Sequence, residues 1–383
     1  MKIIQIGDYP QDENLIKGGV QASVFGLSRA LSRSGNQVTA IAMPSRDIKN
    51  SRIETSKNLT IHFIKNRFKY HILNIFYLGK IVGIIKKESP DVVHIHGTSL
   101  LGLFLLSILR LKCVNTVITI HGIVTIEFWK TLKKSFSLTI LIKLITFFLI
   151  EFLLINISKK IIADTQYVSD TLKKFCFREI TIIPQGIDAS FYQIPDNFVK
   201  NNIISIGVIS PRKGYEYSIQ AISRIKQNYP DLKYTIVGIL KEENRLYYEK
   251  LNELVKKEKL DYQIQIHTDI LFKDLQKLLE KAELFILHSA EESQGIVFCE
   301  AMAAKKPIVG TNIGGIPYVV KNQENGLLSP YGNVESFSNH INLILSDSEL
   351  RKRMSEKSVV FSQQYNWSNI AKKIISTSYN NKV

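Results

Sequence analysis

Apolar positions along the chain fall into short runs that alternate with segments of helical periodicity. Runs of five to seven mostly β-branched residues predict buried strands, because helices need longer segments. In the first half these runs cover 2–7, 37–42, 92–96, 116–121, 160–164 and 181–185, and in the second half 203–208, 233–239, 262–267, 283–289 and 307–311. Residues 19–34, after the first run, have apolar residues at helical spacing. Strands that are almost entirely apolar are typical of parallel sheets covered on both faces, so the predicted fold class is α/β.

The strand–helix alternation stops once and then restarts. The interruption, at 188–202, is polar, contains Pro195 and has no periodicity. Since 383 residues is about twice the usual domain size, we expect two Rossmann-like domains, 1–190 and 202–365, joined by a linker at 191–201. We expect the C-terminal helices, roughly 334–381, to pack back toward the first domain, ending in a last helix at 366–383. Ligands should then bind in a cleft where the carboxyl ends of both sheets meet.

One segment, FSLTILIKLITFFLIEFLLINI at 136–157, is apolar enough to suggest a membrane-spanning helix. Lys143 and Glu151 argue against a span, since each would cost roughly 2.5–3.5 kcal/mol at a bilayer centre. At helical spacing both are expected on one side with Thr139 and Thr146, which leaves a wide apolar face. Two interpretations stay open: a core helix of the first domain, or a helix lying in a membrane interface. The lysines that bracket the segment suit an anionic lipid surface: Lys130, Lys133, Lys134, Lys159 and Lys160.

The charge of the chain is strongly positive and unevenly distributed. Lys and Arg number 50 against 34 Asp and Glu, a formal net charge of +16, and residues 1–200 hold 26 of the basic and 14 of the acidic residues. A basic first half indicates an anionic partner, such as a phosphorylated substrate or a lipid surface. Lysines interleave with aromatic residues in NRFKYH (66–71), but no recognised nucleic-acid motif accompanies them, so nucleic acid is not an expected partner.

The cysteines and the first residues bear on the compartment. Three cysteines lie far apart, with no CxxC pair, so neither a disulfide framework nor a zinc site is indicated. The opening residues, MKIIQIGDYP, are typical of a strand and a turn rather than of a signal peptide. We therefore expect a cytoplasmic protein, peripheral on the inner face of the cytoplasmic membrane if the 136–157 helix is interfacial.

The segment with the clearest chemistry is EESQGIVFCEAMAAKKPIVGTNIGG at 291–315. It follows the apolar run at 283–289, so a helix beginning near Gly295 would point free N–H groups toward an anion such as a diphosphate. Glu292 precedes that helix and Glu300 lies inside it. Carboxylates next to a phosphate site suit hydroxyl groups, for example those of a ribose and a sugar. Two glutamates alone would fit an ordinary amphipathic helix equally well.

The spacing Glu292-x7-Glu300, followed by AMAAKKPIVGTNIGGIP, closely resembles the retaining glycosyltransferases of family 4, which have the GT-B fold of two Rossmann-like domains with parallel sheets facing across a cleft. The resemblance extends in order over almost the whole chain. Its other parts are IKGGVQASVFGLSRALSRSGNQVTAI (16–41), PDVVHIHG (90–97), TIHG (119–122), PQGID (184–188), IGVISPRKG (206–214) and ENGLLSP (324–330), which resembles the turn after the family's last strand.

This resemblance implies a role for each matching residue of the second domain. Glu300 would bind the ribose of the nucleotide, and Glu292 would face the donor sugar. Gly295, Ile296 and Val297 would present backbone N–H groups to the diphosphate.

The loop before them and the first domain would supply the remaining groups. Arg212 and Lys213 would neutralise the diphosphate, whose charge grows as the glycosidic bond breaks. Gly18 and Gly19 would form a loop that closes over the donor, where glycine allows close backbone approach. The resemblance places His121 beside the reacting sugar carbon.

Two details concern the cations of the site. The family usually has an arginine where this chain has Val208, and Arg212 could supply the missing charge from another backbone position. His94, His96 and His121 could in principle bind a metal, but polar residues at strand ends are the commoner explanation. No DxD motif occurs, so neither a metal ion nor another cofactor is expected.

The resulting hypothesis is a hexosyltransferase that retains anomeric configuration. Its donor would be a nucleotide-diphosphate sugar, with UDP preferred on frequency alone. The basic first domain would hold a saccharide or lipid-linked saccharide acceptor, as in the synthesis of capsule, exopolysaccharide or O-antigen. Two alternatives stay open: a sugar-nucleotide epimerase or hydrolase on the same fold, and a non-catalytic binder of nucleotide sugars. Because the sequence lacks GxGxxG, a dehydrogenase is not expected.

Overall fold

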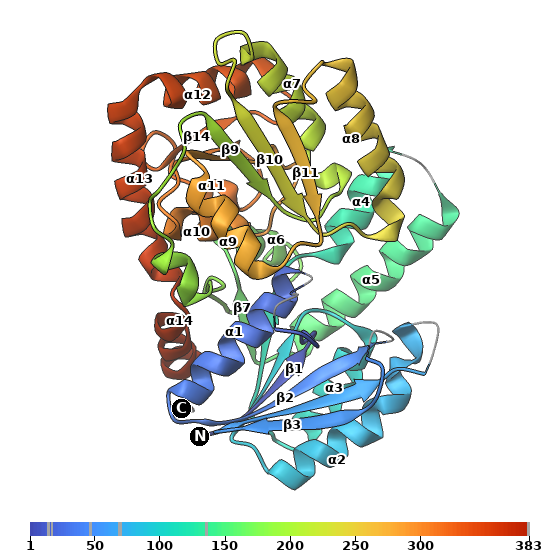
Figure 1. The fold of residues 1–383 in the computed structure, drawn as a ribbon. Helices are drawn as coiled ribbons and strands as arrows, with labels where there is room; N and C mark the ends of the chain where they lie inside the picture. The colour runs from blue at the N-terminus through green and yellow to red at the C-terminus, as the bar shows by residue number, and fades with distance from the viewer. Residues whose placement is uncertain (14–15, 17, 46–47, 68–70, 135–136, 381–383) are drawn as a thin grey trace. The chain divides into compact units, whose positions relative to one another are not determined.

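The computed structural model describes residues 1–13, 16, 18–45, 48–67, 71–134 and 137–380, which form two compact units (Figure 1). Unit 1 consists of Met1–Gly186 together with Trp367–Val383, and unit 2 of Ile187–Asn366. The expected linker, 191–201, lies within unit 2, where Phe191 and Ile194 are buried in the core. Lys17 and Phe136, at the edges of two expected segments, lie outside the described residues.

Unit 1 is built on an eight-stranded sheet with the order β3-β4-β2-β1-β5-β6-β7-β8. All neighbouring strands are parallel except β3 and β4, which pair antiparallel. The strands are β1 (Lys2–Gly7), β2 (Gln37–Ser45), β3 (Arg52–Ser56), β4 (Leu59–Lys65), β5 (Val92–His96), β6 (Thr116–Ile120), β7 (Lys160–Ala163) and β8 (Ile180–Ile182). Strands β3 and β4 were not expected from the sequence. Strand β3 is exposed along most of its length and contains no apolar run, and in β4 polar residues interrupt the apolar ones.

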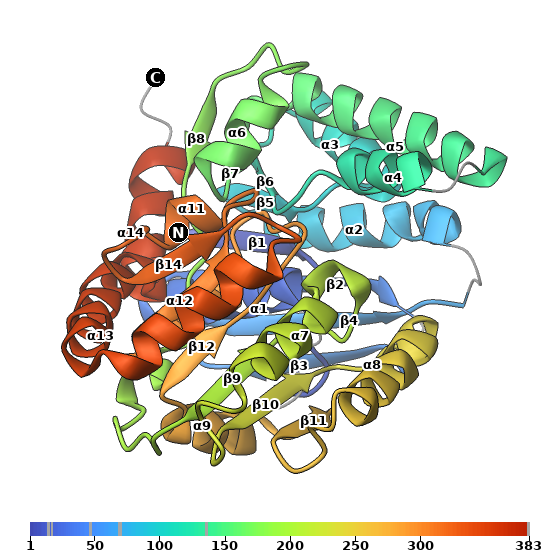
Figure 2. The same ribbon diagram turned by 90° about the horizontal axis from the view of Figure 1, so that it is seen from above.

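Helices cover both faces of this sheet (Figure 2). They are α1 (Gly19–Arg33), α2 (Leu78–Glu88), α3 (Leu100–Leu111), α4 (Val124–Lys134), α5 (Leu138–Ile157), α6 (Gln166–Leu172) and α14 (Trp367–Ile374), with a 3-10 helix η1 (His71–Tyr77) and a π-helical turn η6 (Ile375–Tyr379). Buried residues of α2, α3, α5 and α6 form one core with the strands, and those of α1 and α14 form the other. The sheet is therefore buried on both sides, as its apolar strands predict.

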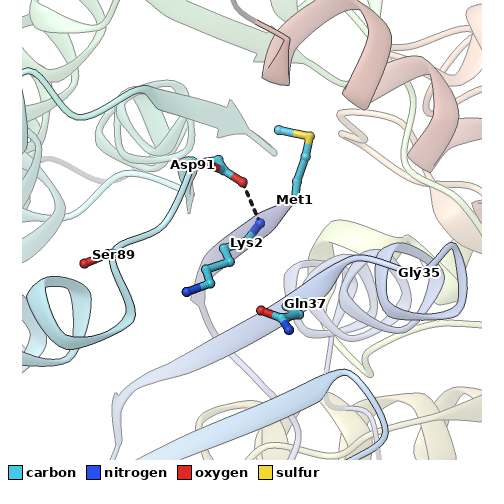
Figure 3. A pocket seen from close by; sticks show the side chains of 6 residues that line it. All are labelled: Met1, Lys2, Gly35, Gln37, Ser89 and Asp91. Atoms are coloured by element: carbon cyan, nitrogen blue, oxygen red, sulfur yellow. Dashed lines mark hydrogen bonds between the residues drawn. The ribbon is translucent and has the colours of Figure 1, made fainter.

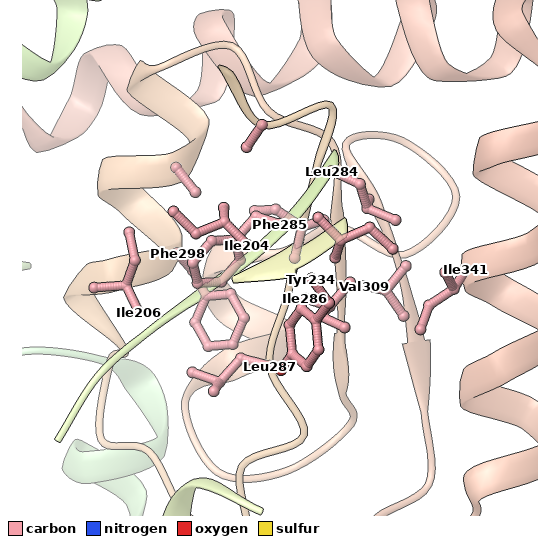
Figure 4. Close-up of a cluster of buried hydrophobic side chains, with 14 of the residues drawn as sticks. Ile204, Ile206, Tyr234, Leu284, Phe285, Ile286, Leu287, Phe298, Val309 and Ile341 are labelled. Carbon is pink, nitrogen blue, oxygen red and sulfur yellow. The ribbon is translucent and has the colours of Figure 1, made fainter. Parts of the chain in front are cut away.

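Unit 2 has a six-stranded, fully parallel sheet with the order β11-β10-β9-β12-β13-β14. Its strands are β9 (Asn202–Ile206), β10 (Lys233–Gly238), β11 (Ile264–Thr268), β12 (Leu284–Ile286), β13 (Ile308–Thr311) and β14 (Gly326–Ser329). Its helices are α7 (Tyr215–Ile225), α8 (Arg245–Lys257), α9 (Phe272–Lys281), α10 (Ile296–Ala303), α11 (Ile316–Val319), α12 (Val334–Ser346) and α13 (Ser348–Ser362), with short turns η2 (Ala189–Gln193), η3 (Pro211–Lys213), η4 (Glu242–Asn244) and η5 (Gln363–Tyr365). Central strands and surrounding helices share one apolar core (Figure 4).

Two expectations for the C-terminal half need correction. The segment 324–330, which we expected to be a turn after the last strand, contains strand β14 itself. Of the C-terminal helices, α12 and α13 belong to unit 2, and only the residues from Trp367 onward belong to unit 1.

The strand order places a topological switch point in each sheet. In unit 2 the chain runs outward from β9 to β10 and β11, then returns to place β12 on the other side of β9. In unit 1, β1 and β5 have the same relation. Loops that follow the two central strands diverge at such a point, and ligands of open α/β sheets bind there. The loops after β9 and β12, and those after β1 and β5, are therefore the places to search for a site.

Helix α5 has a narrow buried face and a wider exposed face. Leu144, Leu154 and Ile155 are buried, whereas only 22% of the most apolar 18-residue window of α5 is buried. Among the described residues, α5 is the one helix that is long and apolar enough to cross a membrane by length and composition. One face of α5 therefore belongs to the core of unit 1, and the rest of the helix is exposed.

Glu151 was expected on the polar side of α5 with Lys143, and this expectation was wrong. Lys143 is exposed, but the Glu151 side chain is buried and faces the start of α4. It accepts hydrogen bonds from the backbone N–H groups of Val124 (2.9 Å) and Thr125 (3.3 Å), and from the hydroxyl of Thr98 (3.3 Å). A carboxylate at a helix N-terminus satisfies free N–H groups, so Glu151 is held by the fold.

A glycine pair receives the indole of Trp367 in unit 1. A Cβ atom added at Gly26 would lie 2.1 Å from this indole, and one added at Gly186 would lie 2.4 Å from it. We expect Gly26→Ala to lower the free energy of unfolding by about 1–3 kcal/mol through overpacking. Denaturant unfolding of the variant measures this change.

The double variant Gly26→Ala/Trp367→Ala provides the matched control. Removing the indole removes the clash, so the two substitutions should be less destabilising together than the sum of their separate effects. Strict additivity would contradict the proposed packing.

Candidate active site

The loops after β9 and β12 lie against each other at the switch point of unit 2. The backbone N–H of Ala290 donates to the carbonyl of Arg212 at 2.8 Å. Gly214 has a φ of +61°, and a Cβ atom there would lie 2.1 Å from the carbonyl oxygen of His288. Only glycine combines this left-handed conformation with so close an approach, so it allows the two loops to meet.

A buried ion cluster joins these loops around Glu292. The Lys213 ammonium lies 2.5 Å from Glu292 Oε1, which also accepts a 2.8 Å hydrogen bond from the Ser289 hydroxyl. Arg212 Nη1 lies 3.4 Å from Glu292 Oε2 and 2.7 Å from the carbonyl of Glu291. Burial works to raise the pKa of Glu292, but the cations of Lys213 and Arg212 outweigh it and hold the pKa below its usual value. Glu292 is thus an ionised hydrogen-bond acceptor.

The predicted helix start at Gly295 is present in the structure. Gly295 is the N-terminal cap of α10, with a φ of +80°, and a Cβ atom on it would lie 2.7 Å from the Phe298 ring. Ile296 and Val297 occupy the first turn, where backbone N–H groups have no partner within the helix. The helix start therefore has the donor groups that an anion needs.

Glu300 lies in the second turn of the same helix and is partly buried. Burial raises the pKa of its carboxyl to about 7, with a further increase from the negative charge of Asp188 and an opposing effect of Lys213. Around neutral pH this carboxyl is therefore divided between its neutral and ionised forms. A ligand that donates hydroxyl groups to it would favour the ionised form.

Sequence reasoning missed two residues that hold Glu292 in place. A Cβ atom on Gly314 would lie 2.4 Å from the Glu292 carbonyl oxygen, and one on Gly315 would lie 1.9 Å from that of Ser293. The Gly315 N–H also donates to the Glu292 carbonyl at 2.7 Å. The two glycines after β13 indicate a close backbone contact, but the sequence does not show which loop they contact.

In unit 1 the structure describes both glycines of the loop after β1. Gly19 is the first residue of α1, and Gly18 precedes it in an extended conformation with a φ of 166°. A Cβ atom added at Gly18 would meet no other atom within 4 Å. The packing of the described chain therefore does not account for glycine at this position.

His121 follows β6, and its ring is held inside unit 1. Its Nδ1 lies 3.2 Å from the carboxylate of Asp164, and its Nε2 lies 3.0 Å from Nδ1 of His96. Asp164 was not among the predicted site residues, although it follows the end of β7 at the same edge of the sheet. Both ring nitrogens of His121 thus have partners from neighbouring strand ends.

The three histidines do not form a metal centre. His94 hydrogen-bonds with Tyr379 and Thr119, rather than turning its nitrogens toward His96 and His121. Among the described residues, no group of three or more His, Cys, Asp or Glu side chains is arranged to hold a metal ion.

A separate pocket lies at the amino ends of β1 and β2 (Figure 3). It is lined by Met1, Lys2, Gly35, Gln37, Ser89 and Asp91, and the Lys2 backbone N–H donates to the Asp91 carboxylate at 2.7 Å. This edge of the sheet is opposite to the one that carries the switch point. The pocket therefore does not contain the candidate site residues.

The glycine contact behind Glu292 generates a test. We expect Gly315→Ala to displace the loop that carries Glu292, and to lower the free energy of unfolding by about 1–3 kcal/mol. Thermal unfolding measures the change. Gly83→Ala in α2 is the control, since a Cβ atom there meets nothing within 4 Å; it should be neutral or stabilising. Equal effects of the two substitutions would refute the close packing at Gly315.

Both halves of the chain match known glycosyltransferases. Residues 17–191 match the family model "Glycosyltransferase Family 4", and residues 191–359 match "Glycosyl transferases group 1". The uncharacterized glycosyltransferase MJ1178 of Methanocaldococcus jannaschii is 25% identical over 81% of this chain and 82% of its own. The UDP-Gal:alpha-D-GlcNAc-diphosphoundecaprenol alpha-1,3-galactosyltransferase of Escherichia coli is 27% identical over 70% of this chain and 69% of its own.

The fold has close counterparts among solved structures. The sucrose-phosphate synthase of Thermosynechococcus elongatus superimposes with a TM-score of 0.83, at 18% identity, over 98% of both chains. This likeness shows a GT-B-like α/β fold with two mostly parallel sheets. The two family models together extend from the α1 loop to α13. The chain belongs to glycosyltransferase family 4 and is a glycosyltransferase.

Proposed function

We propose that the enzyme transfers a hexosyl unit from a UDP-sugar to a lipid-linked saccharide, with retention of anomeric configuration, in the synthesis of a surface polysaccharide such as capsule, exopolysaccharide or O-antigen. The observation that carries the proposal is the cluster around Glu292, next to the start of α10. The name of the Escherichia coli relative, which transfers galactose from a UDP-sugar to a diphosphoundecaprenol-linked acceptor, supports both the donor and the acceptor class.

In this proposal unit 2 binds the donor. The N–H groups at the start of α10 bind the diphosphate, and Arg212, which is 41% exposed, is the cation accessible to it. Lys213 is buried against Glu292, so it contributes its positive charge to the diphosphate site without being exposed there. These groups stabilise the negative charge that develops on the departing UDP. Glu300 accepts hydrogen bonds from the ribose hydroxyls, and Glu292 accepts one from the donor sugar.

The contributions of unit 1 are His121 and the loop at Gly18 and Gly19. We propose that His121 lies beside the reacting sugar carbon and that the glycine loop covers the donor. The open space around a Cβ atom at Gly18 is consistent with close approach of a ligand to the backbone.

The acceptor class is supported by the outer face of α5. Six large apolar side chains of this face are between 39% and 65% exposed: Leu138, Ile142, Ile145, Phe148, Leu149 and Leu153. Residues 101–160 contain eight Lys or Arg and two acidic residues, of which Glu151 is buried. A basic segment with an exposed apolar helix face suits an anionic membrane surface. We therefore propose a peripheral location on the inner face of the cytoplasmic membrane.

The donor site yields a pH prediction. The Glu300 carboxyl accepts hydrogen bonds from ribose hydroxyls best when it is ionised. Because its pKa is about 7, this carboxyl is protonated in most molecules at pH 6. Binding of UDP-glucose should therefore strengthen by about tenfold between pH 6 and pH 8. Isothermal calorimetry without acceptor measures the affinity. UDP-glucose is preferred to UDP, because a terminal phosphate group itself titrates near pH 6.

The controls for this prediction are two variants of Glu300. Glu300→Gln should bind with an affinity that no longer changes across this range. Glu300→Ala should bind more weakly by about 1–3 kcal/mol, the cost of leaving hydrogen-bonding hydroxyls unpaired. Unchanged affinity in Glu300→Ala would show that the ribose lies elsewhere.

The acceptor surface yields a second prediction. The double variant Ile145→Ser/Leu149→Ser removes two adjacent apolar side chains of α5 that are about half exposed, so each should contribute about 0.7–1.5 kcal/mol when buried in lipid. We expect cosedimentation with vesicles that contain anionic phospholipid to weaken by about tenfold or more. Ile53→Ser, which removes an exposed isoleucine from β3, is the matched control.

The same preparations separate transfer from simple hydrolysis. Release of UDP should require an acceptor, and should be faster with a lipid-linked saccharide in vesicles than with a water-soluble one. Full activity on soluble acceptors, with no binding of the wild-type protein to anionic vesicles, would overturn the proposed acceptor class and location.

A further inference from the structure

A row of buried polar side chains crosses unit 1 between the strand ends and the C-terminal turn. Its members come from β1, β5, β6, the residues after β6 and β7, and η6, and each of them is at most 9% exposed: Gln5, His94, His96, Thr119, His121, Asp164 and Tyr379. Polar groups buried to this degree are costly unless they are hydrogen-bonded, and here they are bonded to one another.

The row is a continuous chain of hydrogen bonds. The side chain of Gln5 lies at its centre: Oε1 is 2.6 Å from His96 Nε2, and Nε2 is 2.7 Å from the Tyr379 hydroxyl. Beyond His96, the chain continues to His121 at 3.0 Å and to Asp164 at 3.2 Å. Beyond Tyr379 it continues to His94 Nδ1 and from His94 Nε2 to Thr119 Oγ1, both at 2.7 Å.

The amide of Gln5 sets the direction of this chain. Because its oxygen faces His96, the Nε2 atom of His96 must carry a hydrogen and donate it. Burial lowers the pKa of His96 well below its usual value, so this ring is neutral and its Nδ1 is an acceptor. The hydrogen between the two rings therefore belongs to His121 Nε2.

On the other side of Gln5, donors and acceptors can be assigned in the same way. The amide NH₂ donates to the Tyr379 oxygen, so the Tyr379 hydroxyl is free to donate to His94 Nδ1. Burial lowers the pKa of His94 to about 3, so that ring is also neutral, and its Nε2–H donates to Thr119. Each member donates to the next, and no donor faces another donor.

We propose that Tyr379, Gln5 and His96 are positioning residues that fix the ring of His121 and make its Nε2 a hydrogen donor. With Nδ1 donating to Asp164, His121 then carries a hydrogen on both nitrogens and forms an ion pair with that carboxylate. Such a ring cannot take a proton from an acceptor hydroxyl. It contributes a fixed positive charge beside the reacting sugar, a role that rests on the proposed function of His121.

Tyr379→Phe is the sharpest test, because it removes one hydroxyl and touches neither His96 nor His121. Without that hydroxyl, nothing holds the NH₂ group of Gln5 away from His96. The amide can turn so that its NH₂ donates to His96 Nε2, which gives up its own hydrogen as a proton to solvent. His96 Nδ1 then takes the hydrogen from His121 Nε2 and donates it back, so the His96–His121 part of the chain reverses, the two rings together lose one proton, and His121 Nε2 changes from donor to acceptor.

Nitrogen NMR of protein labelled with ¹⁵N-histidine reads this change directly, since ring nitrogens with and without hydrogen resonate far apart. His96→Asn and His121→Asn variants assign the signals. In the wild type we expect hydrogens on both nitrogens of His121 and a bare Nδ1 on His96. In Tyr379→Phe we expect the hydrogen to move to His96 Nδ1. A bare His121 Nε2 in the wild type, or identical spectra of the two proteins, would overturn the proposal.

Kinetics supplies the second readout. Tyr379→Phe should lower kcat by about fivefold, the effect of one lost hydrogen bond, with an unchanged KM for the donor. Tyr9→Phe is the matched control, because the Tyr9 hydroxyl is buried in unit 1 and has no hydrogen-bond partner among the described residues. It should leave kcat and the histidine spectrum unchanged.

Failure of the directed chain of hydrogen bonds and failure of the proposed function are distinguishable. If His121→Ala keeps full turnover, the proposed role of His121 is wrong, whereas the NMR spectra still decide whether the directed chain of hydrogen bonds exists. If His121→Ala loses turnover but Tyr379→Phe has the kcat and the His121 signals of the wild type, the directed chain of hydrogen bonds is refuted and the role of His121 stands.

Discussion

The ion pair between Lys213 and Glu292 is the contact on which the candidate site of unit 2 depends. It joins the loop after β9 to the loop after β12, which diverge from adjacent strands and have no ladder hydrogen bonds to hold them together. Burying one of these charges alone would be unfavourable, so each residue requires the other. Glycines at 214, 314 and 315 bring the backbones close enough for the pair to form. The ion pair thereby fixes the ammonium group of Lys213 next to the loop that leads into α10.

Features that depend on local pattern were accessible from the sequence. Apolar runs identified most of the parallel strands, and the order strand, loop, glycine and helix placed the start of α10 at Gly295. The residues that match the family could also be named, because motifs are contiguous. Within unit 2, the proximity of Arg212, Lys213 and Glu292 at one sheet edge followed from the rule that parallel strands end together.

What escaped prediction depends on contacts between distant segments. The buried position of Glu151 requires α4 to begin beside α5, and helical periodicity describes only the helix that carries the residue. Asp164, Gln5 and Tyr379 reach His121 from separate strands and from the other end of the chain. Strand β3 lacked an apolar run, since an exposed edge strand has no core to face.

The composition of unit 1 has a consequence for the order in which the molecule forms. Trp367 and Tyr379, which fill the glycine pair and complete the buried polar row, are encoded after all of unit 2. During synthesis, unit 2 can therefore leave the ribosome and fold while the first Rossmann-like sheet still lacks α14, one of the two helices that cover one of its faces. Until Trp367 and Tyr379 have been synthesised, α1 lacks its neighbour on that face and the histidine row ends at Gln5. A nascent chain that stalls before these residues would leave part of the apolar sheet exposed, so α14 and η6 complete the first domain.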